Sequence, residues 1–125
     1  QNEIDKELAQ ALVDNKCFVV SEGANMPSDM DAIRIFQSNK VLYGPAKAAN
    51  AGGVAVSGLE MSQNSSKLLW SREEVDSRLQ GIMKNIHKDA LEAAEAYGCP
   101  GDYLTGANIA GFIKVAKAML AYGVV

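Results

Sequence analysis

Two short apolar runs alternate with helical patterns in the first part of the chain, and this alternation limits the possible folds more than any other feature. Cys17-Phe18-Val19-Val20 is the first run and Val41-Leu42-Tyr43 is the second. Continuous apolar runs of this length are typical of strands that helices cover on both faces. The order helix, strand, helix, strand with short connections predicts parallel pairing through right-handed crossovers.

Helical patterns stand before each run. Ile4, Leu8 and Leu12 recur at helical spacing, with Asn2 as the expected N-cap, and Ser28 is the expected cap of a second short helix. Two strands are too few for an independent sheet. The fold class is therefore predicted to be α/β, with the trailing half of a doubly wound parallel sheet and about two strands.

The pattern after residue 47 is almost entirely helical. One helix is expected from about 52 to 66. A capping box of Ser71 and Glu74 opens a long helix that ends at 98–101, and Thr105 is the expected cap of a last helix. This part is predicted to be a helix-rich segment that follows the sheet.

Composition excludes several classes of function. The chain has 125 residues, a net charge of -3 and no basic patch, which argues against a nucleic-acid partner. No uninterrupted apolar run approaches the roughly 18–20 residues of a membrane helix, so no membrane partner is expected. One histidine and two distant cysteines offer no metal-ligand spacing. The two cysteines and the lack of a signal-like first segment favour a cytoplasmic location.

Small residues follow both predicted strands. Residues 47–57 contain Gly52, Gly53 and Asn50, and residues 21–27 contain Glu22 and Asn25. In an open α/β sheet, ligands bind outside the carboxyl ends of the strands, and an amide offers both donors and an acceptor. The stretch 47–57 is therefore either a ligand-binding edge or a close helix–helix contact, and Lys47 at its start is either a ligand-facing charge or a surface lysine.

Several stretches also resemble a known family. The match includes residues 21–27, 47–64 and 106–112, together with Trp70 and Ile86-His87. These residues resemble the hexameric, NADP-type glutamate dehydrogenases, and the likeness spans essentially the whole chain. The resemblance implies a piece of a longer enzyme. Residues 1–46 would end a Rossmann-type cofactor-binding domain, and residues 47–125 would close that domain and return toward a substrate domain outside the chain.

The resemblance implies a reaction and a set of site residues. The family reaction is the reversible oxidative deamination of L-glutamate to 2-oxoglutarate and ammonia, with hydride transfer to NADP. NAD stays open as the cofactor, because the residues that read the ribose lie upstream. The resemblance assigns Gly23, Ala24, Asn25 and Asn50 to the cofactor, and Val54 and Ser57 to the substrate. No catalytic residue and no metal ligand is expected in this chain.

An alternative of another class is a non-catalytic α/β association module without a ligand. In that case the small residues of 47–57 would serve packing alone. For Ser57, the alternative to a substrate contact is a hydrogen bond to the backbone four residues earlier in its helix.

Overall fold

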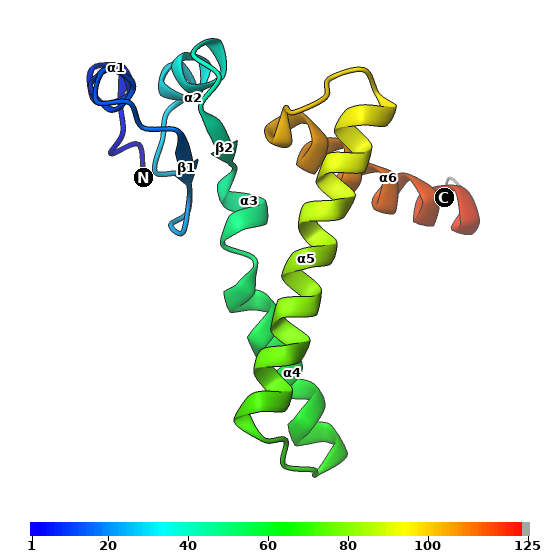
Figure 1. The fold of residues 1–125 in the computed structure, drawn as a ribbon. Coiled ribbons are helices and arrows are strands. Elements are labelled where there is room, and N and C mark those ends of the chain that lie inside the picture. Colours follow the sequence, from blue (N-terminus) through cyan, green and yellow to red (C-terminus); the bar gives the residue numbers. More distant parts are fainter. Residues whose placement is uncertain (124–125) are drawn as a thin grey trace.

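The computed structural model describes residues 1–123, which form two parallel strands and six helices (Figure 1). One group of elements surrounds the strands, and a second group of long helices extends away from them. The elements in chain order are α1 (Lys6–Asp14), β1 (Val19–Ser21), α2 (Met30–Ser38), β2 (Leu42–Gly44), α3 (Ala46–Ala49), α4 (Gly52–Ser66), α5 (Arg72–Ala96) and α6 (Tyr103–Tyr122).

The two strands pair in parallel, with Val20 opposite Tyr43 and Ser21 opposite Gly44. This pairing confirms the predicted α/β class. Helices α1 and α2 pack together beside the strands and form the core with them (Figure 1). Phe36 lies at its centre, and its ring stacks on that of Tyr43 at a centroid distance of 6.0 Å. The buried residues of this core are Ala9, Ala32, Ile33, Phe36, Val41 and Tyr43.

The strands are less covered than their sequences predict. Phe18 lies just outside β1 and is 76% exposed, and Leu42 is also exposed. The expectation of strands buried on both faces is therefore wrong for the described residues. On the side away from the core, β1 and β2 meet α5 and α6 across an open pocket that His87 and Tyr103 line.

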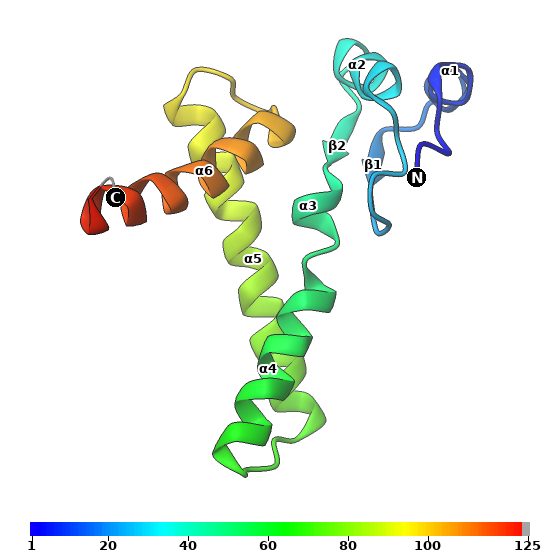
Figure 2. The same ribbon diagram turned by 180° about the vertical axis from the view of Figure 1, so that it is seen from behind.

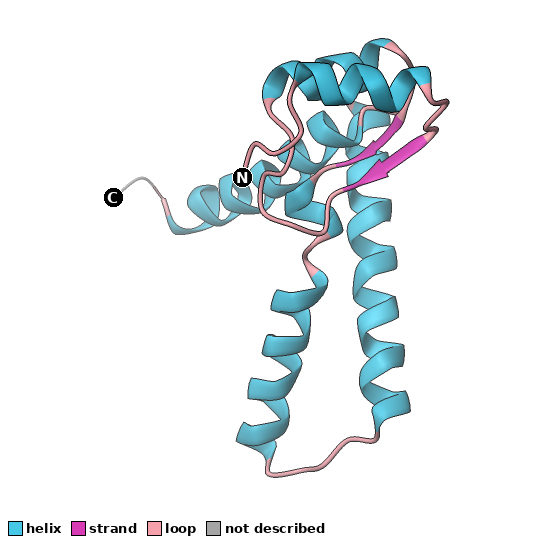
Figure 3. Cartoon of the chain, turned by 90° about the vertical axis from the view of Figure 1, so that its left-hand side faces the viewer, coloured by secondary structure: helices cyan, strands magenta, loops and turns pink. Residues whose placement is uncertain are grey.

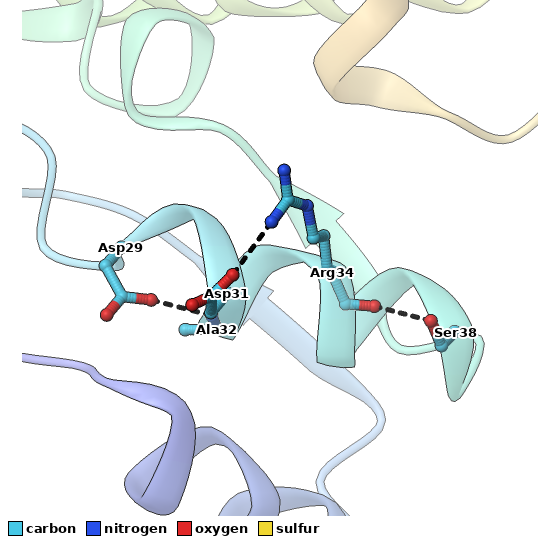
Figure 4. A network of polar contacts seen from close by, with 5 residues as sticks. All are labelled: Asp29, Asp31, Ala32, Arg34 and Ser38. Atoms are coloured by element: carbon cyan, nitrogen blue, oxygen red, sulfur yellow. Dashed lines mark hydrogen bonds and ion pairs between the residues drawn. The ribbon is translucent and has the colours of Figure 1, made fainter.

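Aspartates cap three of the helices, in place of the residues expected from the sequence. Figure 4 shows one of them, Asp29, which accepts a hydrogen bond from the backbone N–H of Ala32 at 2.7 Å. Asp5 caps α1 and Asp102 caps α6 in the same way. A carboxylate is both a good acceptor and a negative charge at the positive end of the helix dipole. The predictions of Asn2, Ser28 and Thr105 as caps are therefore wrong.

The segment before α1 is extended rather than helical. Asn2 has a left-handed φ of 57°, and its backbone N–H donates to the carbonyl of Met26 at 2.8 Å. Ile4 forms an isolated parallel bridge with Ser28. This pairing fixes the loop that follows β1, and it explains why the first helix begins only at Lys6.

Helices α4 and α5 form a long hairpin that extends away from the strands (Figure 3). Both were expected from the sequence, whereas the single turn α3 was not. Trp70 closes the hairpin loop. Its backbone N–H donates to Gln63 Oε1 at 2.9 Å, and the guanidinium of Arg78 lies 4.4 Å from the centre of its ring.

Helix α6 lies across α5 (Figure 2), and these two helices share the most extensive contact of any pair of elements. Gly106 is buried there, and a Cβ atom on it would lie 2.1 Å from the carbonyl oxygen of Ala90. Because that distance is far below any van der Waals contact, the crossing requires glycine. The motif 106–112 thus has a packing role in this fold.

Within the described residues, α6 is also the one helix whose length and mean hydropathy of 1.2 would suit a membrane span, with 6% of that span buried. Lys114 and Lys117 interrupt the apolar sequence of this helix, so it contains no continuous apolar run of membrane-spanning length. A single helix of this length and hydropathy is weak evidence for a membrane segment, because core helices of soluble proteins can have the same length and hydropathy.

Candidate functional site

The loops that follow β1 and β2 meet at the carboxyl edge of the strand pair. The backbone N–H of Glu22 donates to the carbonyl of Gly44 at 3.1 Å, which extends the pairing beyond the strands. The side chain of Asn50 then reaches the first loop. Its Nδ2 donates to the carbonyl of Ala24 at 3.2 Å and to Asn25 Oδ1 at 2.7 Å. Ala24, Asn25 and Asn50, all predicted to bind the cofactor, therefore lie together, with Gly23 in the same loop.

Glu22 is buried beneath this edge, with only 4% of its surface exposed. Its two carboxylate oxygens accept hydrogen bonds from two different loops. Oε1 accepts from the backbone N–H of Ser28 at 3.3 Å, and Oε2 accepts from that of Ala46 at 3.0 Å. Both bonds are charge-assisted, which makes them stronger than bonds between neutral groups.

Tyr43 lies next to this carboxylate in β2 and is almost fully buried. Burial, and secondarily the hydrogen bond and negative charge of Glu22, raise the pKa of the Tyr43 hydroxyl far above its usual value. The hydroxyl is therefore neutral at physiological pH. It can donate a hydrogen bond, but it cannot serve as a base.

A cavity of about 680 Å³ opens at this edge. This volume lies within the range of small-molecule sites, which run from roughly 300 to 1,000 Å³. Its lining combines amides, a lysine, the carboxylates of Glu22 and Asp29 and apolar side chains, so it offers both polar and apolar partners to a small molecule. The lining residues include Asn2, Glu22, Asn25, Met26, Ile33, Lys47, Asn50 and Leu104.

Lys47 connects this edge with the last helix. The side chain is exposed, and its Nζ donates to Asn108 Oδ1 on α6. The contact links the stretch 47–57 to the motif 106–112, which lies far away in the sequence. Lys47 also borders the cavity, so it has a structural partner and a position at the candidate site.

Val54 and Ser57 lie apart from the cavity, on helix α4. Val54 is 79% exposed, and Ser57 is also exposed. The Ser57 hydroxyl donates to the carbonyl of Gly53 at 3.1 Å, which is the backbone hydrogen bond considered as the alternative for this residue. The predicted cofactor residues thus lie together in the structure, whereas the two predicted substrate residues lie apart from the cavity.

Comparison with known proteins identifies the family. A sequence profile of the Glutamate/Leucine/Phenylalanine/Valine dehydrogenases matches residues 1–123. The chain belongs to this dehydrogenase family. A glutamate dehydrogenase of Bacteroides thetaiotaomicron is 60% identical to the chain, and an NADP-specific glutamate dehydrogenase of Escherichia coli is 53% identical. Each alignment covers 100% of this chain and 28% of the relative.

Solved structures agree with this assignment. The chain superimposes on a glutamate dehydrogenase of Plasmodium falciparum with a TM-score of 0.96 at 52% identity, covering 100% of this chain and 27% of that one. The suspected resemblance to glutamate dehydrogenases is thereby confirmed. This dehydrogenase chain spans somewhat more than a quarter of the length of the relatives that it matches.

Some features of this dehydrogenase chain were not predicted from its sequence. Glu22 was identified as a carboxylate at the ligand edge, but its two backbone partners were not. The available signal was a single acidic residue between an apolar run and a glycine. His87 lies 5.3 Å from the ring of Tyr103, and it has no histidine, cysteine or carboxylate partners that could complete a metal site among the described residues.

Proposed function

We propose that this chain is the C-terminal part of an NADP-linked glutamate dehydrogenase. In this proposal residues 1–46 end a Rossmann-type cofactor domain, and residues 47–125 close that domain and return toward a substrate domain. The observation that carries the proposal is the pair Asn25 and Asn50, joined at the carboxyl edge of a parallel strand pair. Ligands bind at this edge in doubly wound sheets.

The residues of the edge fit one end of a nicotinamide cofactor. The neutral amides and small residues suit the nicotinamide and its ribose, and Lys47 is the one cation lining the cavity. In our proposal Gly23, Ala24, Asn25 and Asn50 hold that end and orient the ring. The cofactor, when bound, accepts a hydride from the carbon that carries the amino group of glutamate.

In the proposal Val54 and Ser57 form part of the substrate pocket. Ser57 lies in the second turn of α4, close to the positive end of the helix. Its hydroxyl donates to the carbonyl of Gly53, and by rotating about the Cα–Cβ bond it would donate instead to a carboxylate of the substrate. Val54 offers an exposed apolar surface for the methylene groups of glutamate.

Proton transfer is assigned to residues outside the chain. Glu22 is the carboxylate at this edge, and both of its oxygens are engaged by backbone amides. Tyr43 keeps its proton. In this proposal the chain therefore binds and orients the cofactor and the substrate, whereas the acid and base groups belong to the substrate domain. We further propose a hexameric assembly in the cytoplasm, without nucleic-acid or membrane partners.

The test is an assay of the full-length protein that contains this chain. We expect glutamate-dependent reduction of NADP, with NAD assayed in parallel. Activity with leucine, phenylalanine or valine and none with glutamate would overturn the choice of substrate.

A non-catalytic association module predicts a different result. It predicts that neither NADP nor glutamate slows hydrogen exchange in the loops of Asn25 and Asn50. We expect slower exchange in both loops when NADP is bound.

A further inference from the structure

Glu22 is a buried carboxylate without a cationic partner among the described residues. A buried charge is costly unless hydrogen bonds compensate it. The compensation here comes from the backbone N–H groups of Ser28 and Ala46, at 3.3 and 3.0 Å, and from the neighbouring hydroxyl of Tyr43. An apolar side chain in the same space would leave these two backbone N–H groups without an acceptor, so the carboxylate at this position serves the two segments that carry them.

The two partners of Glu22 belong to the two loops that form the candidate site. Ser28 lies near the end of the loop that carries Asn25, and Ala46 begins the single turn α3, whose C-cap is Asn50. The partners lie 6 and 24 positions from Glu22 in the sequence. One carboxylate therefore joins the far end of the first loop to the near end of the second.

Other contacts between the two loops are more exposed to water. The bonds from Asn50 to Ala24 and Asn25 are exposed, so water competes with them. The backbone bond from Glu22 to Gly44 fixes the start of the first loop only. The buried carboxylate is the contact that is both protected from water and shared between the loops.

We propose that Glu22 is a positioning residue of the candidate site: its carboxylate, bonded to the backbone N–H groups of Ser28 and Ala46, sets the spacing between Asn25 and Asn50. The role of this spacing in binding a nicotinamide cofactor rests on the proposed function. The connection between the two loops is independent of the proposed function. Glu22 itself touches no reacting atom in this proposal, and it acts through the loops.

Glu22→Gln in the full-length protein tests the proposal. Glutamine has one acceptor oxygen, and its NH2 group would face a backbone N–H, so one loop loses its bond. We expect faster hydrogen exchange in peptides covering 26–30 and 45–50 without ligand. We also expect the Kd for NADPH and the KM for NADP to rise about tenfold, which corresponds to about 1.4 kcal/mol, while kcat at saturating cofactor stays within about threefold.

Two further variants make the test specific. Glu22→Asp keeps both acceptors on a shorter side chain, so it should give intermediate exchange and an intermediate Kd. If Glu22→Gln does not fold, the hydrogen exchange and the Kd of Glu22→Asp test the proposal in its place. Glu95→Gln removes the same charge from an exposed position on α5 and should match the unmodified protein in every measurement.

The proposal is overturned if exchange in both loops is unchanged, or if exchange accelerates while the Kd for NADPH stays the same. The second result, with a lower Tm, would assign Glu22 to stability alone. Failure of the unmodified protein to bind either nicotinamide cofactor would instead overturn the proposed function. The exchange measurement without ligand would still report on the connection between the loops.

Discussion

Among the individual residues of this chain, several carboxylates accept hydrogen bonds from backbone N–H groups. Asp5, Asp29 and Asp102 cap helices, and Glu22 joins two loops. In each case a negative oxygen satisfies donors that the local backbone leaves without a partner. Asp102 does more than cap, because it also accepts from Gln37 Nε2 at 3.0 Å and so connects α6 to α2.

Replacing Asp102 tests the value of this cap. Asp102→Ala removes the acceptor for the N–H of Thr105 and should lower the free energy of unfolding by about 1–2 kcal/mol. Asp102→Asn keeps an acceptor oxygen and should cost much less. Denaturant unfolding of the full-length protein measures both changes, and equal losses in the two variants would contradict the capping role.

Tyr43 predicts a dependence of stability on pH. Its pKa is raised in the folded state, so above a pH of about 10 the unfolded chain releases this proton while the folded protein retains it. The contribution of Tyr43 to stability is therefore complete below pH 10 and declines as the pH rises further. Tyr43→Phe should lose less stability than the unmodified protein between about pH 9 and 11.

Thermal unfolding across this range provides the measurement. The matched control is Tyr97→Phe, because it removes the same hydroxyl from an exposed position. Lysines titrate in the same range, so the comparison between the two tyrosine variants is the informative one. Parallel profiles for both variants would show that Tyr43 ionises normally.

The packing of helices against one another depends on small residues. Ala90 and Ala94 on α5 and Gly106 on α6 are all buried at the crossing of these helices. Helix α4, by contrast, buries no residue completely and contacts mainly α5. The α5–α6 crossing therefore holds the last helix, and through the contact of Lys47 with Asn108 it also steadies the candidate site.

Gly106→Ala should disrupt this crossing. The new methyl group would lie 2.1 Å from the carbonyl oxygen of Ala90, so the helices would have to separate, at a cost of about 2–4 kcal/mol. Gly111→Ala in the same helix is the matched control. A Cβ atom there meets no neighbour within 4 Å, and alanine should stabilise the helix by about 0.5–1 kcal/mol.

Denaturant midpoints of the two glycine variants give the answer. Destabilisation by Gly106→Ala together with a neutral or stabilising Gly111→Ala would support the close crossing. Equal effects from both substitutions would mean that only helix propensity matters at these positions.

Across the whole molecule, large apolar side chains are exposed. Leu69 is 94% exposed, and Phe18, Phe112 and Leu120 are also exposed. They are spread over the strand pair, the tip of the α4–α5 hairpin and helix α6. Their distribution agrees with a chain that spans only part of the length of its relatives.

The 125-residue chain on its own should therefore self-associate and lack dehydrogenase activity. Exposed apolar surface and an uncovered strand edge both promote association. Light scattering after size-exclusion chromatography should give a mass above that of one chain, and glutamate with NADP should give no turnover. A stable monomer, or measurable turnover, would contradict this prediction.

The edge of the strand pair that carries the candidate site could be predicted from the sequence, but the contacts within that edge could not. The position of two loops after two parallel strands follows from the apolar runs, and Asn25 and Asn50 do lie together there. The bond from Glu22 to Ala46 spans 24 positions, and that from Lys47 to Asn108 spans 61. Such bonds depend on how the elements pack, which no local pattern records.

Local sequence patterns were sufficient to predict the parallel strand pair, the two long helices α4 and α5 and the resemblance to the dehydrogenase family. Helical periodicity, apolar runs and motifs are local, and local hydrogen bonds and burial follow from them directly. The packing of the whole chain, by contrast, established where Gly106 lets α6 approach α5 and that Glu22 joins the two loops. These two features arise because folding brings groups together that lie far apart in the sequence, and buried polar groups among them must then find partners.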